Sequence, residues 1–275
     1  MGSWLAALLT TLFLLSSAAA ETVRFRSTTW PPTPLQQRLA KAAGQTIAEQ
    51  ASVELAGELY RPPGKAPFPA VVLLHPCSGR LAPRLEQADA ARYTALGYVL
   101  LAVDSFGSRG IADGCTGSGA SVDMVMDAYG ALLHLAALPF VDADRIALVG
   151  YSFGGSVALS AVAFDGPERL FDRQFTTAIA YYPSCPERAA VGVPTVILIG
   201  ERDEWAPVRA CREMMARRSG LGAPLRLVVY PEAHHAFNLP LGPRRSYGHR
   251  LEYNETADRA AWSETVAALR AAFGR

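Results

Sequence analysis

Short apolar segments recur along the chain and alternate with longer stretches of helical character. Near-continuous apolar segments of this length are typical of buried strands, and intervening helices indicate a parallel sheet covered on both faces. One further segment, 53–60, alternates apolar and polar residues and predicts a half-exposed antiparallel strand. Buried strands are predicted at 70–74, 98–103, 145–149, 177–182, 195–200 and 225–230, and helices near 84–96, 122–137, 156–163 and 258–273.

Two segments lack such a pattern. Residues 23–50 contain a proline-rich turn at 31–34 and a polar stretch, and no element is assigned there. Residues 239–256 are rich in Pro, Gly and Arg, which predicts a mobile loop near the functional site. The length suits one large α/β domain as well as two small ones. We expect residues 21–275 to form a single α/β domain.

The first 20 residues have the character of a secretory signal. Met1–Ala20 contains no charged side chain, has an apolar centre from Leu5 to Leu15, and ends in Ser16-Ser17-Ala18-Ala19-Ala20. Small residues of this kind precede signal cleavage sites, and the apolar stretch is short for a membrane span. We therefore expect a cleaved signal rather than an uncleaved anchor, and a periplasmic or secreted protein.

The overall composition narrows the class of partner. The formal net charge is +1 over 275 residues, which gives no electrostatic reason for a nucleic-acid partner. No phosphate-binding glycine loop or nucleotide fingerprint is present, and no cysteine or histidine spacing is typical of a metal site. We expect no cofactor and no metal. Lysine occurs only at positions 41 and 65 among the 26 basic residues, which hints at a GC-rich bacterial genome.

Four cysteines fit an oxidising compartment. Three pairings are possible, and free buried thiols are the alternative. We favour Cys77 with Cys115 and Cys185 with Cys211, because the members of each pair follow strand ends expected at the same sheet edge.

A candidate nucleophile lies between the strand 145–149 and the helix 156–163. The run Gly150-Tyr151-Ser152-Phe153-Gly154-Gly155 contains the G-x-S-x-G pattern, whose glycines allow a sharp turn that exposes the serine hydroxyl above the sheet. A solvated serine in a glycine-rich turn is the alternative. The strand–turn–helix context favours Ser152 as a nucleophile.

A serine hydroxyl needs a base, and the base needs an orienting carboxylate. In α/β-hydrolases the acid follows the serine in the chain and the histidine follows the acid. After the strand 195–200 we choose Asp203 as the acid, with Glu201 and Glu204 as competitors. After the strand 225–230, His234 and His235 compete for the role of base. His75, His134 and His249 lie outside the expected loop.

An oxyanion forms when the hydroxyl attacks a carbonyl, and backbone amides can stabilise it without reorganising. One amide belongs to the residue after the nucleophile, Phe153. The second belongs to the loop after the strand 70–74, where Cys77 is the expected donor. A plain turn that ends the strand is the alternative for this loop.

Arg109 follows the strand 98–103, whose carboxyl end should open onto the same crevice as Ser152. Its guanidinium could bind a substrate carboxylate through two hydrogen bonds. An ion pair with Asp104, Asp113 or Asp123 that orders the loop is the alternative, and we favour it slightly.

Taken together, five motifs resemble the dienelactone hydrolase family of α/β-hydrolases over about residues 53–273. The resemblance implies that His235 rather than His234 is the base, because the family has a His-Ala/Ser-Phe run, and that Asp203 is the acid. Founding members have a cysteine where this chain has Ser152, and many relatives have His-Gly where it has His75-Pro76. The motifs are 75–79 (HPCSG), 104–110 (DSFGSRG), 150–155 (GYSFGG), 200–205 (GERDEW) and 230–237 (YPEAHHAF).

The sequence therefore predicts an α/β-hydrolase fold and a carboxylic-ester or lactone hydrolase that acts on a small molecule through an acyl-enzyme. The serine shifts the expected substrate from dienelactone toward general carboxylic esters. A non-catalytic binding module of the same fold is a second hypothesis. An acyl transferase or peptidase with the same three residues is a third, since other nucleophiles can intercept an acyl-enzyme.

Overall fold

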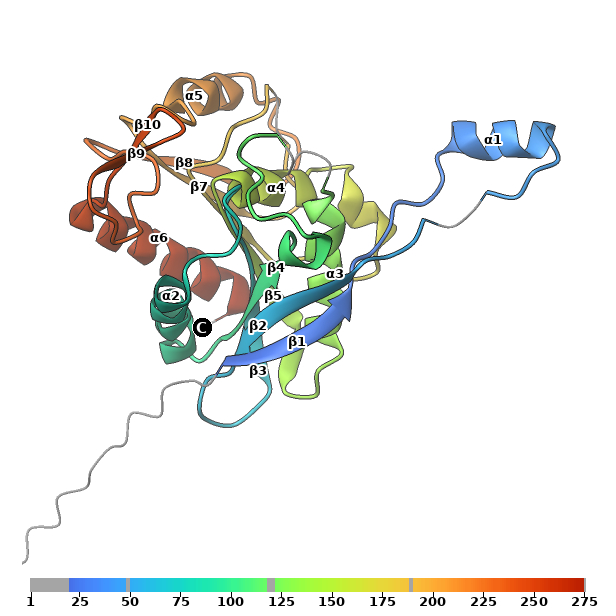
Figure 1. The fold of residues 1–275 in the computed structure, drawn as a ribbon, viewed down its shortest axis with the longest axis horizontal. Helices are drawn as coiled ribbons and strands as arrows, with labels where there is room; N and C mark the ends of the chain where they lie inside the picture. Colours follow the sequence, from blue (N-terminus) through green and yellow to red (C-terminus); the bar gives the residue numbers. More distant parts are fainter. Residues whose placement is uncertain (1–19, 48–49, 118–121, 188–189, 275) are drawn as a thin grey trace, which may run out of the picture.

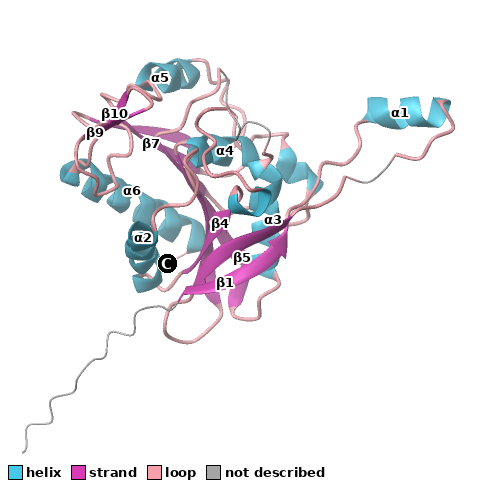
Figure 2. Ribbon diagram, in the orientation of Figure 1, coloured by secondary structure: helices cyan, strands magenta, loops and turns pink. Residues whose placement is uncertain are grey.

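A computed structural model describes residues 20–47, 50–117, 122–187 and 190–274. An eight-stranded sheet runs through the molecule in the order β1-β2-β4-β3-β5-β6-β7-β8 (Figures 1 and 2). Its strands are β1 (Ala20–Arg26), β2 (Glu54–Tyr60), β3 (Phe68–Leu74), β4 (Val99–Asp104), β5 (Val141–Tyr151), β6 (Ala178–Tyr181), β7 (Thr195–Gly200) and β8 (Leu225–Tyr230).

The pairing of the strands matches the expected α/β-hydrolase fold. Every neighbouring pair from β4 through β8 is parallel, whereas β2 is antiparallel to both β1 and β4. All seven residues of β3 and all six of β7 are buried. Their continuous apolar sequences follow from this burial, because helices cover both faces of the sheet.

The helices form two layers (Figure 2). α3 and α4 contact each other and β5 on one face, whereas Trp262 of α6 packs edge-to-face on Tyr93 of α2 at the other. α5 lies beside β8, and α1 extends away from the sheet with no buried residue (Figure 1). The helices are α1 (Pro34–Ala42), α2 (Pro83–Ala95), α3 (Met124–Ala136), α4 (Phe153–Ala161), α5 (Val208–Ala216) and α6 (Glu255–Phe273).

Several elements were not expected from the sequence. β1 lies at a sheet edge and owes its pairing to β2, a long-range contact that its own sequence does not display. α1 begins at a capping box in which Thr33 and Gln36 bond each other's backbone amides. α5 was also missed.

Residues 239–256, expected to be a mobile loop, contain a hairpin instead. It consists of β9 (Arg244–Ser246) and β10 (His249–Leu251). Three-residue strands are too short to give a recognisable alternation. The hairpin is joined to the rest of the fold by a parallel bridge between Leu251 and His235.

The expected signal at Met1–Ala20 lies outside the described residues except for Ala20, which begins β1. Across the portion of the chain that the structure covers, no helix combines the length and the apolar character needed to cross a membrane.

The sheet brings the candidate functional residues together. Ser152 follows β5, Asp203 follows β7, His235 follows β8, and Cys77 follows β3. Because parallel strands end at one edge of the sheet, these four loops meet there.

Candidate active site

The turn that carries Ser152 is sharply bent. Ser152 has φ 54° and ψ −114°, a conformation that L-residues rarely adopt and that persists only where its surroundings enforce it. A Cβ atom at Gly150 would lie 2.1 Å from the Gly154 carbonyl oxygen, and one at Gly154 would lie 2.5 Å from that of Leu74. The two motif glycines therefore permit backbone approaches that no other residue allows.

Ser152, His235 and Asp203 form a continuous chain of hydrogen bonds. The Ser152 Oγ lies 2.9 Å from His235 Nε2, and His235 Nδ1 lies 2.8 Å from Asp203 Oδ2. Since the carboxylate only accepts, the proton of neutral His235 is on Nδ1, and Nε2 is free to accept the hydroxyl proton. His235 and Asp203 are 3% and 5% exposed.

The second oxygen of Asp203 is also fixed. Asp203 Oδ1 accepts hydrogen bonds from the backbone amides of Trp205 and Ala206, at 2.9 and 2.8 Å. The competing carboxylates have other partners: Glu201 pairs with Arg212, and Glu204 with Arg245.

Two aromatic rings hold the His235 imidazole. Tyr182 meets it edge-on, with ring centroids 4.7 Å apart, and Trp205 lies at 5.2 Å. The Tyr182 hydroxyl is itself bonded to Asn238 Oδ1 at 2.8 Å. The sequence indicated no role for either aromatic residue, although Trp205 directly follows the segment 201–204 that contains the candidate acids.

The neighbouring histidine, His234, faces away from this arrangement. Its Nδ1 lies 3.0 Å from the Arg202 carbonyl oxygen, so it ties together the two loops after β7 and β8. Two other histidines contact aromatic rings. His134 stacks on Phe25 of β1, an edge strand that is separated from β5 by three strands. His249 stacks on Trp205, with ring centroids 5.0 Å apart.

The two expected oxyanion amides border the serine. Phe153 opens α4, where the first backbone amides have no partner within the helix. The Cys77 amide has no acceptor among the described residues, and Cys77 and Phe153 border the same cavity as Ser152.

Disulfides join Cys77 to Cys115 and Cys185 to Cys211, the two pairings favoured from the sequence. The Cys77 carbonyl also accepts a hydrogen bond of 2.7 Å from the Gly114 amide. The loop with the Cys77 amide is therefore attached at two points, to Gly114 by this hydrogen bond and to Cys115 by the disulfide. The second disulfide attaches α5 to the segment after β6.

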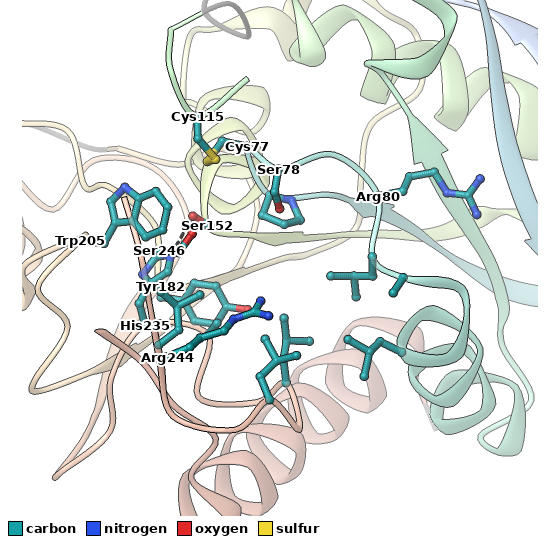
Figure 3. Close-up of a pocket in the computed structure, with 18 residues that line it drawn as sticks. Cys77, Ser78, Arg80, Cys115, Ser152, Tyr182, Trp205, His235, Arg244 and Ser246 are labelled. Carbon is teal, nitrogen blue, oxygen red and sulfur yellow. Dashed lines mark hydrogen bonds between the residues drawn. A yellow bond between two sulfur atoms is a disulfide. The ribbon is translucent and has the colours of Figure 1, made fainter. Parts of the chain in front are cut away.

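Two cavities meet at Ser152. One, of about 230 Å³, also contacts Tyr182, Trp205 and His235 (Figure 3). The other, of about 400 Å³, extends past Phe153 to Ser156 and Ser184. An ester has two substituents around its carbonyl, and two cavities can receive one each. Apolar side chains line much of the first cavity, namely Leu81, Ala82, Leu85, Leu239, Leu241 and Leu251.

Arg109 occupies a different place from the one expected of a substrate-binding residue. Its guanidinium makes two hydrogen bonds of 2.9 Å to Asp127 and a third, of 2.6 Å, to the Ser105 carbonyl. It borders neither of the two cavities at Ser152. The ion-pair alternative matches this geometry, but its partner is Asp127 on α3 rather than a carboxylate of the same loop, because α3 packs against the sheet there.

Two other arginines border the first cavity. The Arg80 guanidinium binds Glu86 and turns away from Ser152 (Figure 3). Arg244, on β9, is exposed and extends along the cavity, with no ion-pair partner in the described part of the chain. The sequence indicated Arg244 only through the arginine-rich character of 239–256.

The hairpin and the loop after β4 meet beside the site. The Tyr247 hydroxyl donates a hydrogen bond of 2.5 Å to Asp113 Oδ2, while Asp113 Oδ1 accepts from the Cys115 amide at 2.7 Å. Among the residues described, no group of three or more His, Cys, Asp or Glu side chains is placed to hold a metal ion.

The sheet topology and the bent serine turn define an α/β-hydrolase. The model of the dienelactone hydrolase family matches residues 55–273, and the chain belongs to that family.

Individual relatives are more distant. Two uncharacterized proteins of Mycobacterium tuberculosis strains are 26% identical over 223 residues, covering 74% of this chain and 76% of theirs. A dienelactone hydrolase-like promiscuous phosphotriesterase, P91, from metagenomic libraries has a TM-score of 0.66 and 19% identity, covering 92% of this chain and 98% of its own. A propionate-bound esterase of Thermogutta terrifontis has a TM-score of 0.58 and 19% identity, with coverages of 78% and 88%. At these sequence identities, the similarity to the solved structures supports the assignment of the fold alone.

Proposed function

We propose that this protein hydrolyses carboxylic esters or lactones of small molecules, with Ser152 as nucleophile, His235 as general base and acid, and Asp203 as the carboxylate that orients the histidine. The observation that carries the proposal is the hydrogen-bonded chain from Ser152 Oγ through both ring nitrogens of His235 to Asp203. A serine activated in this way attacks an acyl carbon.

In the first half-reaction, Ser152 Oγ forms a bond to the substrate carbonyl carbon while His235 Nε2 takes the hydroxyl proton. The carbonyl electron pair moves to oxygen, and the amides of Cys77 and Phe153 donate hydrogen bonds to that oxyanion. When the intermediate collapses, the bond to the leaving oxygen breaks and His235 returns the proton to it. A linear ester loses an alcohol, whereas a lactone retains its hydroxyl on the acyl chain.

In the second half-reaction, His235 Nε2 takes a proton from water as the water oxygen attacks the acyl carbon. Collapse of this intermediate breaks the bond to Ser152 Oγ, which recovers its proton from His235. The carboxylic acid leaves. Asp203 stays ionised throughout and stabilises the imidazolium that forms twice in the cycle.

The decisive experiment replaces Ser152 with Ala and measures hydrolysis of short p-nitrophenyl esters and a lactone. We expect the rate to fall by a factor on the order of 10⁴ or more. A phosphonylating serine probe should label wild-type protein at Ser152 and leave S152A unlabelled. Undiminished turnover by S152A would refute the assignment, and a wild-type protein that is neither labelled nor active would favour a binding module.

We further propose that the protein acts outside the cytoplasm. The support comes from two disulfides and from the signal-like sequence of Met1–Ala20. Fractionation of cells that express the full chain, with the N-terminal residue of the mature protein determined by sequencing, tests both statements. Recovery in the cytoplasm with residues 1–20 attached would contradict them.

A further inference from the structure

His75 directly follows β3 and precedes the loop that carries the Cys77 amide. Its side chain is 4% exposed and its ring meets Phe106 edge-on at 4.6 Å. The mechanism above assigns this buried imidazole no role.

Both ring nitrogens of His75 have backbone partners. The Ser105 amide lies 3.2 Å from Nε2, and the Pro76 carbonyl oxygen lies 2.7 Å from Nδ1. A backbone amide only donates, so Nε2 must accept and carries no proton. The proton of the neutral ring is therefore on Nδ1, where it is donated to the Pro76 carbonyl.

The Pro76 carbonyl belongs to the same peptide group as the Cys77 amide. This peptide is planar and trans, so its oxygen and its N–H point in opposite directions. The Gly79 amide also donates to the Pro76 oxygen, at 3.1 Å. Two donors on one side of the peptide thus determine where the Cys77 N–H points on the other.

We infer that His75 is a positioning residue, whose Nδ1–H holds the Pro76–Cys77 peptide so that the Cys77 amide is aimed at the oxyanion formed at Ser152. The inference rests on the proposed function and adds to it a group that does not touch the substrate.

The surroundings of His75 keep it in the form that this role needs. Burial has the largest effect and lowers the pKa of His75, and the charge of Arg80 lowers it further. The hydrogen bond to the Pro76 carbonyl and the charges of Asp104 and Glu86 raise this pKa. Protonation of Nε2 would set two donors, the ring N–H and the Ser105 amide, against each other. The neutral ring is the one compatible with both contacts.

Two conservative variants separate the two ends of the ring. The Asn side chain in His75→Asn places an amide nitrogen near the position of Nδ1 and can donate to the Pro76 carbonyl, but it cannot reach Ser105. The Gln side chain in His75→Gln places its oxygen near Nε2 and can accept from Ser105, but it leaves the Pro76 carbonyl without that donor. Both variants are uncharged and polar.

We expect H75Q to lower kcat for a p-nitrophenyl ester about 10- to 100-fold with KM nearly unchanged, since removal of a whole oxyanion donor costs about 10²- to 10³-fold. H75N should retain kcat within about threefold. Circular dichroism and thermal melts establish that each variant is folded. Equal losses in H75N and H75Q, no loss in H75Q, or a loss confined to KM would each overturn the inference.

A measurement on the wild-type protein needs neither variant nor turnover. Long-range ¹H–¹⁵N correlation spectra at neutral pH should show His75 with a protonated Nδ1 and an unprotonated Nε2. A proton on Nε2 would overturn the inference. If wild-type protein lacks esterase activity while the tautomer is as expected, the proposed function fails rather than the geometry of the loop.

Discussion

The Arg109 guanidinium and the Asp127 carboxylate form a bidentate ion pair, with a hydrogen bond of 2.9 Å to each carboxylate oxygen. The Asp127 side chain is fully buried, and burial raises the pKa of Asp127 against the opposing effect of Arg109. The pair joins the loop after β4 to α3. Arg109 therefore connects two elements of the fold, and it lines neither of the cavities at Ser152.

Replacement of Arg109 with Ala should consequently affect stability rather than selectivity. Loss of one partner from a buried ion pair typically costs about 3 kcal/mol or more, so the free energy of unfolding in urea should fall by this order. Hydrolysis of neutral and anionic esters should change by the same factor. A selective loss for anionic esters would instead support contact between Arg109 and substrate.

Arg244 is the matched comparison, because its exposed guanidinium borders the first cavity without an ion-pair partner in the described chain. We expect R244Q to lower kcat/KM about fivefold to tenfold for an ester with a carboxylate on its acyl chain, since a charge-assisted contact at an exposed position is worth about 1 kcal/mol. The neutral ester of the same length is the control and should be unaffected. A kcat/KM for the charged ester that is the same in R244Q and wild type would contradict this prediction. An equal loss for the neutral ester would also contradict it.

The two disulfides should differ in their effect on activity. Their half-cystines are 38 and 26 residues apart, so loop-closure entropy predicts similar losses of about 3.5 to 4 kcal/mol when either is removed. C77A/C115A should also lower kcat about tenfold, because the loop that carries the Cys77 amide then keeps only the hydrogen bond from Gly114 and loses the bond to Cys115. C185A/C211A serves as the control and should retain kcat.

These two double variants are compared by denaturant unfolding and by steady-state kinetics at a temperature where both remain folded. A kcat that falls equally in the two would show that the Cys77–Cys115 bond has no particular relation to the oxyanion amide.

Asp89 on α2 gives the protein a pH-dependent component of stability. Its carboxylate accepts a hydrogen bond of 2.6 Å from the Tyr151 hydroxyl, one residue before Ser152, and burial raises the pKa of Asp89 to about 6. Because the folded-state pKa exceeds the unfolded one, the stabilisation is complete below the unfolded pKa and is lost as the pH rises through about 6.

Between pH 5 and pH 8, the free energy of unfolding of the wild-type protein should therefore fall by about 1 kcal/mol because of Asp89 alone. The Asn side chain of Asp89→Asn cannot ionise and still offers Tyr151 an acceptor. The stability difference between D89N and wild type should shift by this amount over that range, as measured by urea unfolding at both pH values. A difference that is independent of pH would contradict the raised pKa.

Most strands and helices that surround the site were predictable from local patterns. The predicted strands 195–200 and 225–230 coincide with β7 and β8. Both are short, mostly apolar segments bounded by turn residues, and Arg226 is the one charged residue within them. α6 was expected at 258–273 and begins three residues earlier, at a cap supplied by Asn254. The G-x-S-x-G run marked the turn at Ser152 for a local reason, since its glycines are required by the turn itself.

Other features depend on residues far apart in the chain. The sequence by itself indicated the strands β2 to β8, four of the helices, the candidate residues at the strand ends and the class of fold. Three features became visible only in the folded chain: Arg109 binds Asp127 on α3, Arg244 borders the cavity, and backbone groups contact both nitrogens of His75. The physical reason is that hydrophobic periodicity records which face of an element is buried, whereas the partner of a polar side chain is chosen by whichever element the fold brings against it.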